Sequence, residues 1–200
     1  MDKQFSKEEV AEKVLEQYDE EQTRIFYTYV MGGGGNDIHF GIYRDPTDGV
    51  KESANRTTEW MMTQMDMAKE ITKDMHVLDV GSGHGGGSHA MAKKFGCKVT
   101  GINIGPGQNA MNVAKAKELG LGHLIDAVVG NINEPLPEEW TGKFDAIWSC
   151  EVLCHAGDKL ALFKDLYRCL KPGGVFVFSD ICGADGAAEA ADLTVRVVEL

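Results

Sequence analysis

The sequence lacks the features that mark several whole classes of protein. No apolar run approaches the roughly 18 residues that would span a bilayer, and no charged and apolar leader follows Met1. Basic residues are outnumbered, since 31 Asp and Glu face 20 Lys and Arg and give the 200-residue chain a net charge of −11. Because such a surface repels a phosphate backbone, we expect neither a membrane nor a nucleic acid as the partner.

Paired thiols and paired metal ligands are also lacking. The cysteines are odd in number and form no C-x-x-C pair. They are Cys97, Cys150, Cys154, Cys169 and Cys182. The nearest histidines, His84 and His89, are five residues apart, whereas a spacing of four aligns two ligands on one face of a helix. We therefore expect buried structural thiols, a reducing cytoplasm and no metal site.

The chain divides into three stretches of different pattern. Residues 1–74 hold helical periodicity and an aromatic stretch that runs into glycines, and we expect them to form a helical lid. In residues 75–182, short apolar runs alternate with amphipathic helices, which predicts an α/β core. The expected strands are 76–80, 98–102, 126–129, 144–149 and 175–179. We expect a Rossmann-like, open and mainly parallel sheet with helices on both faces and a ligand crevice at the carboxyl ends of its strands. Residues 183–200 form a short C-terminal segment.

Glycine is abundant, with 24 residues where an average usage of roughly 7% predicts about 14. Part of the excess falls in the loop 81–87 after the first expected strand, where Gly81, Gly83 and Gly86 match the dinucleotide pattern G-x-G-x-x-G. Asp79, just before this loop, places a carboxylate where it would oppose a pyrophosphate but suit a cationic sulfonium ligand. S-adenosylmethionine is therefore the favoured ligand, and a nicotinamide oxidoreductase is the alternative from another enzyme class.

Several motifs carry a resemblance to known families. V-L-D-V-G-S-G-H-G-G at 77–86, followed by L-K-P-G-G at 170–174, resembles the class I S-adenosylmethionine-dependent methyltransferases. The stretches F-Y-T-Y-V-M-G-G-G-G-N-D-I-H-F-G-I-Y, A-N-R-T-T-E-W and I-N-I-G-P-G-Q-N are similar to the sarcosine/dimethylglycine N-methyltransferases that make glycine betaine. Phosphoethanolamine N-methyltransferases are relatives with a comparable lid. The resemblance covers most of residues 18–180 and implies methyl transfer from S-adenosylmethionine to a small amine.

The resemblance implies a set of cofactor contacts at the ends of successive strands. These residues are Asp79, Gly81, Gly83, Asn103, Ile104, Gln108, Asn131, Ile132, Ser149 and Glu151. The first three would line the methionine part of the cofactor, the middle five its ribose and adenine, and the last two the sulfonium. Asn103 departs from the family, where an acidic residue usually takes the ribose hydroxyls, although an amide also donates and accepts hydrogen bonds.

The implied catalytic residues are Tyr18 and His155. In the phosphoethanolamine relatives a histidine at the position of His155 pairs with an N-terminal tyrosine, and the Q-Y context of Tyr18 matches that tyrosine. The resemblance implies a latch over the pocket in which His155 accepts the amine proton, directly or through water. A histidine without catalytic duty and a tyrosine that only packs in the lid remain alternatives. Further residues that would close the cofactor or substrate pocket, or serve as scaffold, are Tyr27, His39, Tyr43 and Arg56.

Some questions stay open from the sequence. The acceptor could instead be a phosphoethanolamine-type amine, or a sulfur or arsenic nucleophile held by Cys150 or Cys154. The resembled families complete their sheet with a sixth and a seventh strand, whereas this chain ends about 20 residues after the fifth, so we expect those strands to be missing. Residues 193–200 would then be the next helix or an edge strand. The fifth strand would lie near an exposed edge that favours self-association, and an inactive cofactor-binding module remains a further alternative.

Overall fold

Parallel strands form the centre of the molecule where the sequence predicts them. The computed structural model describes residues 7–181 and 194–199, so Cys182 and the residues 183–193 lie outside it. The strands of the parallel part are β1 (His76–Val80), β2 (Lys98–Asn103), β3 (Ile125–Val129), β4 (Phe144–Cys150) and β5 (Leu170–Asp180). Their order in the sheet is β3-β2-β1-β4-β5, and Val77 of β1 lies opposite Val99 of β2 and Ala146 of β4. The winding therefore reverses between β1 and β4, which is where open α/β sheets bind ligands.

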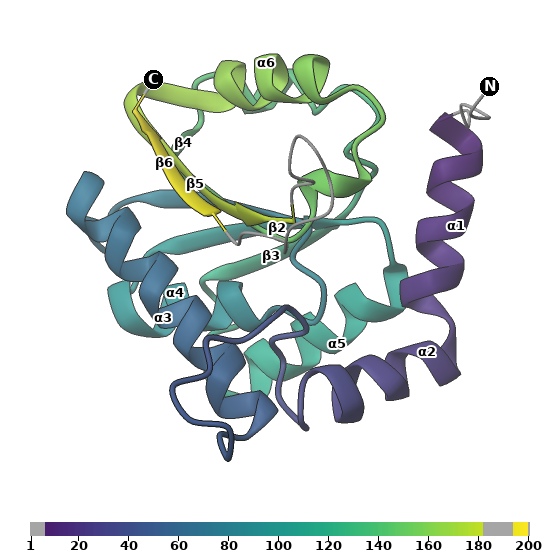
Figure 1. Cartoon of the computed structure of the whole chain (residues 1–200). Helices are drawn as coiled ribbons and strands as arrows, with labels where there is room; N and C mark the ends of the chain where they lie inside the picture. The colour runs from purple at the N-terminus through teal and green to yellow at the C-terminus, as the bar shows by residue number, and fades with distance from the viewer. Residues whose placement is uncertain (1–6, 182–193, 200) are drawn as a thin grey trace, which may run out of the picture.

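Helices cover both faces of the sheet (Figure 1). One face packs against α3 (Val50–Ala68), α4 (Gly86–Phe95) and α5 (Pro106–Glu118), and the other against α6 (Lys159–Cys169). Val77 is buried with Met61 and Met65 on the first face, while its neighbour Leu78 is buried with Leu166 on the second. Because successive strand residues point to opposite faces and both faces are covered, the central strands β1 and β4 are buried along nearly their whole length.

The ends of these helices follow from local sequence. Pro106 begins α5, where its missing N–H costs no hydrogen bond. Asp158 precedes α6 and accepts a hydrogen bond from the Ala161 amide at 2.9 Å. Gly96 follows α4 with a φ of 70°, in the left-handed region that ends many helices. These residues set where the helices between the strands begin and end.

The N-terminal part of the chain reaches the same end of the sheet. It comprises α1 (Lys7–Asp19), α2 (Glu21–Phe26) and a short π-helical turn, η1 (Tyr27–Met31). In Figure 1, α1 and α2 lie beside the N-terminal end of α5, and a connector then leads back to α3. The helix predicted over 53–71 is observed as α3, which begins and ends three residues earlier.

One expectation about the end of the sheet is wrong, and one alternative is confirmed. A further strand, β6 (Thr194–Glu199), pairs antiparallel with β5, so that Val177 lies opposite Val197. The unpaired backbone groups of β5 are therefore satisfied, and this strand is not the exposed edge that the sequence predicts. The edges of the described sheet are β3 and β6, so residues 194–199 form the edge strand that the sequence left open as an alternative to a helix.

The start of β5 also differs from its prediction at residue 175. The strand begins at Leu170, and its register with β4 shifts between Phe144 and Ala146. Gly173 lies within this irregularity with a φ of 72°. Two lysines hold it, because Lys171 Nζ lies 2.8 Å from an Asp145 carboxylate oxygen and Lys69 Nζ donates to the Gly173 carbonyl at 2.8 Å.

The thiols are less uniformly buried than predicted. Cys97 and Cys169 are buried, Cys150 is partly buried and Cys154 is exposed. The expectation is therefore wrong for Cys154, which lies in the short helix η3 (Leu153–His155) after β4. Within the described ranges, no helix combines the length and apolar character needed to cross a membrane.

Candidate active site

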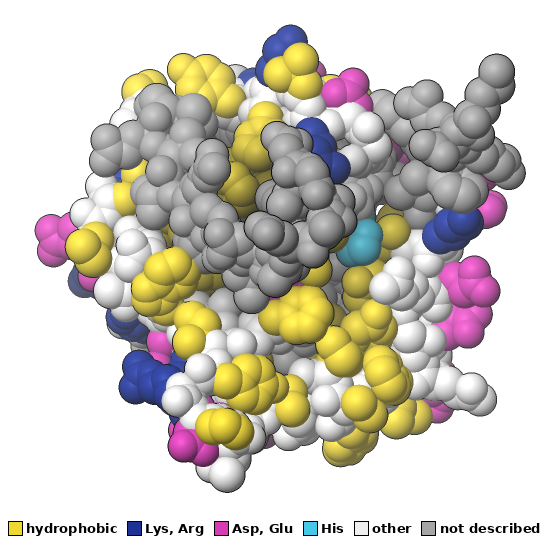
Figure 2. Space-filling model, viewed as in Figure 1, with side chains coloured by type: hydrophobic (Ala, Val, Ile, Leu, Met, Phe, Trp, Pro, Cys, Tyr) yellow, Lys and Arg dark blue, Asp and Glu magenta, His cyan; other side chains and the backbone are white. Residues whose placement is uncertain are grey.

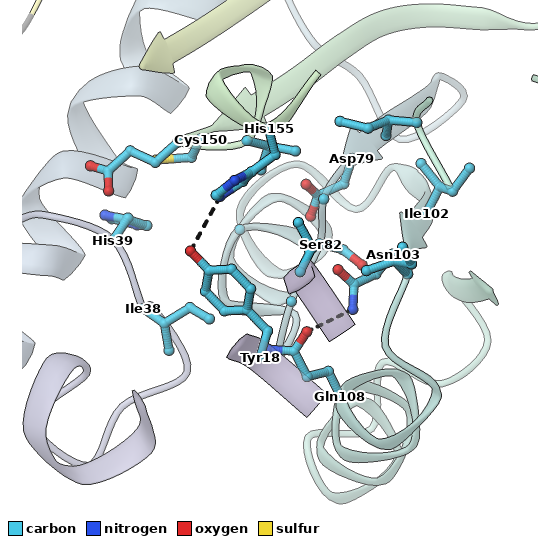
Figure 3. A pocket seen from close by; sticks show the side chains of 18 of the residues that line it. Tyr18, Ile38, His39, Asp79, Ser82, Ile102, Asn103, Gln108, Cys150 and His155 are labelled. Carbon is cyan, nitrogen blue, oxygen red and sulfur yellow. Dashed lines mark hydrogen bonds between the residues drawn. The ribbon is translucent and has the colours of Figure 1, made fainter. Parts of the chain in front are cut away.

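A cavity opens at the carboxyl ends of β1, β2 and β4, between the sheet and the N-terminal segment (Figure 3). Most of the predicted site residues line it. They are Tyr18, His39, Asp79, Gly81, Gly83, Asn103, Ile104, Gln108, Asn131, Ile132, Glu151 and His155. The structure thus brings the glycine loop, the strand ends and two residues of the N-terminal segment together around one space.

Ser149 and Tyr27 stand behind the cavity instead of lining it. The Ser149 side chain is fully buried, and its hydroxyl donates to the Val80 carbonyl at 3.3 Å. Tyr27 packs its ring against that of Tyr18, with 4.8 Å between the centroids. Both residues therefore support residues of the wall and do not themselves line the cavity.

Tyr43 and Arg56 lie outside the site. Figure 2 shows apolar side chains gathered on the outer face of the N-terminal segment, where Tyr43 is 51% exposed. Arg56 pairs with Asp48 at 2.5 Å and with Glu52 at 2.5 Å, and so fixes the 44–48 loop to α3. The prediction that these two residues close the pocket is wrong, because each lies next to a motif in sequence but on another surface in space.

The glycine loop brings bare backbone to the cavity. Gly81, Gly83 and Gly85 have φ angles of 73°, 50° and 86°, a region in which other residues are strained. The Gly81 amide donates to the Ile102 carbonyl of β2 at 2.8 Å, which ties the loop to the sheet. A Cβ at Gly86 would collide with a carboxylate oxygen of Asp37. The rest of the chain therefore packs against this loop more closely than a side chain at residue 86 would allow.

Carboxylates dominate the charge of this cavity. Asp79 accepts a hydrogen bond from Ser88 Oγ at 2.6 Å. Burial raises the pKa of Asp79 to about 6, although the bond from Ser88 opposes this rise. Asp37 and Glu151 also line the cavity, and no Lys or Arg is among the described residues that do so. Such a site favours a cationic ligand over a phosphate.

Amide side chains lie at the opposite end of the cavity from His39 and Cys150 (Figure 3). Asn103, at the end of β2, donates from Nδ2 to Gln108 Oε1 at 2.9 Å. Asn131, after β3, accepts the Asn133 amide at 3.0 Å, which turns the chain beside Ile132. Asn103 and Asn131 therefore each place polar groups beside apolar side chains of the wall, an arrangement that suits the hydroxyls and the base of a nucleoside.

A tyrosine and a histidine from distant parts of the chain meet over the cavity. Tyr18 Oη lies 3.2 Å from His155 Nε2, and the two rings are edge to face with 5.6 Å between centroids. Burial, and then Tyr27, raises the pKa of Tyr18 well above its usual value, whereas burial lowers the pKa of His155. Both groups are therefore neutral near pH 7, with the phenol donating to the imidazole.

A second contact joins the N-terminal segment to the end of β4. The Phe40 amide donates to Glu151 Oε1 at 2.9 Å. Glu151 has a φ of 55°, the one positive value outside glycine in the described chain. Burial raises the pKa of Glu151, and the bond from Phe40 opposes that effect.

His39 lies on the same side, next to Cys150. Its Nε2 is 3.0 Å from Thr58 Oγ1 and 3.6 Å from Asp37 Oδ1. Burial lowers the pKa of His39, but the attraction of the neighbouring Cys150 and Asp37 outweighs it and raises the value to about 11. His39 is therefore an imidazolium in the wall of the cavity.

The sequence analysis missed several lining residues. The main ones are Asp37, Ser82, Trp148 and Asn133. Cys150, which the sequence suggests only as a holder of a sulfur or arsenic nucleophile, also lines the cavity. Asp37 follows the glycines at 32–35, and Cys150 directly precedes Glu151 at the end of β4, so position alone could have indicated both. Trp148 could not have been found in this way, because it reads as an ordinary buried strand residue.

The cavity fits the cofactor that the sequence favours. Ser82 Oγ is buried and has no hydrogen-bond partner in the described part of the chain, so it is free for a ligand. The glycine walls, the carboxylates and the paired amides supply the bare backbone, negative charge and polar groups that an adenosylated sulfonium compound needs. A pyrophosphate would instead face Asp37 and Asp79.

Comparison with known proteins agrees with this geometry. The sequence profile of a methyltransferase domain matches residues 78–178. The chain is 33% identical to the sarcosine/dimethylglycine N-methyltransferase of Halorhodospira halochloris over 182 residues, which are 91% of this chain and 63% of that protein. A crystal structure of a candidate sarcosine dimethylglycine methyltransferase from Galdieria sulphuraria is 33% identical, with a TM-score of 0.74 over 82% of this chain and 60% of that one.

A more distant structure shares the fold alone. It is the phosphoethanolamine N-methyltransferase 2 of Haemonchus contortus in complex with phosphomonomethylethanolamine and S-adenosylhomocysteine, 22% identical with a TM-score of 0.70, covering 90% of this chain and 37% of that one. The chain spans less than two thirds of the length of each of these three relatives. Because the matched profile runs from β1 to β5 and covers half of the sequence, this chain belongs to the methyltransferase domain family.

Proposed function

We propose that this chain is the catalytic part of an S-adenosylmethionine-dependent N-methyltransferase that acts on a small amine, with sarcosine or dimethylglycine preferred. The observation that carries the proposal is the Tyr18–His155 pair, which meets over a cavity with three carboxylates and no described Lys or Arg in its wall. The likeness to sarcosine/dimethylglycine N-methyltransferases over 91% of the chain supports the choice of acceptor.

The residues that would hold the cofactor follow from the shape of the cavity. Asp79 and the glycine loop would take the cationic methionine part, and Asn103 with Gln108 the ribose hydroxyls. Asn131 and Ile132 would bracket the adenine. When bound, S-adenosylmethionine supplies an electrophilic methyl group on its sulfonium. The chain itself must align an amine nitrogen with that group and exclude water.

The amine must lose a proton before it can accept a methyl group, because a protonated amine has no lone pair. Tyr18 Oη can take this proton while its own proton passes to His155 Nε2, 3.2 Å away. His155 is suited to receive it because its imidazole is neutral near pH 7. After transfer, the methylated nitrogen is a cation, which the Tyr18 ring and the nearby carboxylates stabilise.

The charges of the wall also separate the possible acceptors. A phosphate is usually bound by Arg or Lys, and neither is among the described lining residues. A single carboxylate needs less charge, and the imidazolium of His39 suits it. This difference supports an amino acid such as sarcosine over phosphoethanolamine.

A methyl-transfer screen tests the proposal. The full chain is incubated with S-adenosylmethionine labelled in its methyl group, with glycine, sarcosine, dimethylglycine or phosphoethanolamine as acceptor, and with a chelator to remove metal ions. We expect label on sarcosine and dimethylglycine. Preferred labelling of phosphoethanolamine would overturn the proposal that sarcosine or dimethylglycine is the acceptor. Tight cofactor binding without label on any of the four compounds would favour an inactive module and overturn the proposal that the chain is an enzyme.

The remaining predictions concern organisation and location. We keep residues 1–74 as the lid and 75–182 as the cofactor-binding core, since Tyr18 and His39 reach the cavity from the first and the glycine loop from the second. The described cysteines are free, which supports a reducing cytoplasm. Self-association through β5 is not proposed, because β6 pairs with that strand.

A further inference from the structure

Three side chains with metal-binding atoms converge at the acceptor end of the cavity. One donor atom each of His39, Cys150 and Glu151 lies within 4.8 Å of the other two. All three side chains are partly buried, and all line the cavity. Figure 3 shows His39 and Cys150 together, on the far side of Tyr18 from Asn103 and Gln108. The cluster is therefore separate from the residues that would hold ribose and adenine.

The surroundings of the cluster orient its donors. His39 Nδ1 lies 3.1 Å from the Phe40 carbonyl, so Nδ1 keeps its proton and Nε2 is the nitrogen that loses its proton and binds a metal. The Phe40 amide holds Glu151 Oε1 at 2.9 Å and leaves the other carboxylate oxygen free to coordinate. The same peptide segment therefore positions two of the three ligands, as outer hydrogen bonds do in known metal sites.

A further carboxylate favours a cation at this position. Asp37 Oδ1 lies 3.6 Å from His39 Nε2 and is a buried oxygen without a hydrogen-bond partner in the described ranges. It is close enough to join the ligands or to balance the charge of a bound ion. Thr58 Oγ1, now 3.0 Å from Nε2, would have to rotate away, which a hydroxyl does at little cost.

We propose that His39, Cys150 and Glu151 form a binding site for Zn²⁺ at the acceptor end of the cavity. Zinc accepts imidazole nitrogen, thiolate sulfur and carboxylate oxygen in one tetrahedral shell, and three protein ligands leave a fourth position open. Donors in such a shell are about 3.5 Å apart, so small side-chain rotations complete it. Binding forms bonds from zinc to the imidazole nitrogen, the sulfur and the carboxylate oxygen, and the thiol proton of Cys150 and the Nε2 proton of His39 are released to solvent.

The position of the site has a consequence for methyl transfer. An amine that coordinates the open position of the ion commits its lone pair to the metal and cannot attack a methyl group. The bound ion also takes His39 away from the carboxylate of an amino-acid acceptor. Zinc and the acceptor therefore compete, and zinc acts as an inhibitor that a chelator removes.

Direct zinc binding to the full chain tests the site without any turnover. The chain, free of cofactor, competes with a chromophoric chelator for Zn²⁺, and Cys150→Ser and Glu151→Gln are measured beside it. Cys154→Ser is the matched control, since this exposed thiol lies outside the cluster. Thermal unfolding of each variant without metal checks that it is folded.

We expect one zinc ion per wild-type chain, an affinity at least tenfold weaker for Cys150→Ser and Glu151→Gln, and no change for Cys154→Ser. With Co²⁺ in place of zinc, the near-ultraviolet absorption of a thiolate bound to cobalt should appear in the wild type and vanish in Cys150→Ser. Equal zinc affinity of wild type and Cys150→Ser, or an equal loss in Cys154→Ser, would overturn the site. Because no acceptor is present, this result is independent of whether sarcosine is methylated.

Discussion

Tyr18 and His155 lie 137 positions apart in the chain, yet their side chains are 3.2 Å apart over the cavity. Their ionisation states are complementary, because burial disfavours charge on both the phenol and the imidazole. A neutral pair can pass a proton from Tyr18 Oη to His155 Nε2, which neither residue could do if it were already charged. These two residues can therefore carry out the acid–base step of the proposed reaction.

Removal of either partner should slow turnover more than it weakens cofactor binding. General base catalysis contributes roughly 10²- to 10⁴-fold to a rate, so we expect His155→Ala to lower kcat by about 10²-fold or more and Tyr18→Phe by at least about tenfold. The cofactor contacts lie elsewhere in the cavity, so the Kd for S-adenosylhomocysteine should stay within about twofold. Steady-state kinetics and calorimetry measure the two quantities, and unchanged kcat in both variants would refute the latch.

Asp79 should make the stability of the cofactor-free chain depend on pH. Burial raises its pKa from 3.8 to about 6, so the folded chain holds this proton more tightly than the unfolded chain. The resulting stabilisation of the folded chain is fully present below about pH 4 and is lost as the pH rises through 6. The difference between the unfolded and folded pKa values of Asp79 corresponds to roughly 3 kcal/mol of unfolding free energy.

The variant Asp79→Asn carries no such proton and can still accept from Ser88. We expect its unfolding free energy in urea to equal that of the wild type near pH 4 and to exceed it by up to about 3 kcal/mol above pH 7. Its affinity for S-adenosylmethionine should fall, because the carboxylate that suits the cation is gone. A stability difference that is the same at every pH would contradict the buried carboxylate.

At the scale of elements, the glycine loop and the N-terminal connector depend on each other. Gly86 begins α4, and a Cβ there would meet Asp37 Oδ1 and lie 2.8 Å from the Asn36 carbonyl. The connector can therefore pack on the loop only while residue 86 has no side chain. The same connector carries Asp37 and His39 into the cavity, so its position affects the site directly.

Gly86→Ala should displace the connector and weaken the binding of S-adenosylmethionine. A tenfold loss of affinity corresponds to about 1.4 kcal/mol, and we expect at least that from a collision with backbone and a buried carboxylate. Gly49→Ala is the matched control, because Gly49 has an ordinary φ of −70° and open space around its Cβ position. Calorimetry should show no change for Gly49→Ala, and equal affinities for both variants would refute the close packing.

The same elements show how far sequence reasoning reaches. The strands around His76–Val80 and Phe144–Cys150 are predicted because short apolar runs alternate with amphipathic helices along the chain. The β6 pairing and the irregular start of β5 depend on contacts between distant segments, which periodicity does not contain.

The candidate site follows the same division. Most residues predicted at strand ends and in the glycine loop line the cavity, because topology fixes their place. Tyr43 and Arg56 come from a region whose path depends on tertiary packing, and they point elsewhere. Asp37 enters the pocket wall through the folded connector, whereas Cys150 lies at the end of β4 beside Glu151.

At the scale of the whole molecule, the winding of the sheet and the path of the N-terminal segment create one cavity. The sheet order places the ends of β1 and β4 side by side, and α1 with the connector covers them (Figure 1). The chain has a net charge of −11, and its excess of acidic residues extends to the cavity, where Asp37, Asp79 and Glu151 line the wall. A cavity of this charge is suited to a sulfonium cofactor and opposes a dinucleotide that carries a pyrophosphate.

A direct comparison of S-adenosylmethionine and NADH binding tests the proposed function most directly. S-adenosylmethionine and NADH are titrated separately into the full chain in a calorimeter, without an acceptor. The account predicts that one S-adenosylmethionine binds per chain and that NADH releases no binding heat at the same concentrations. Binding of NADH with equal or higher affinity would contradict the central claim that this cavity is built for a cationic methyl donor.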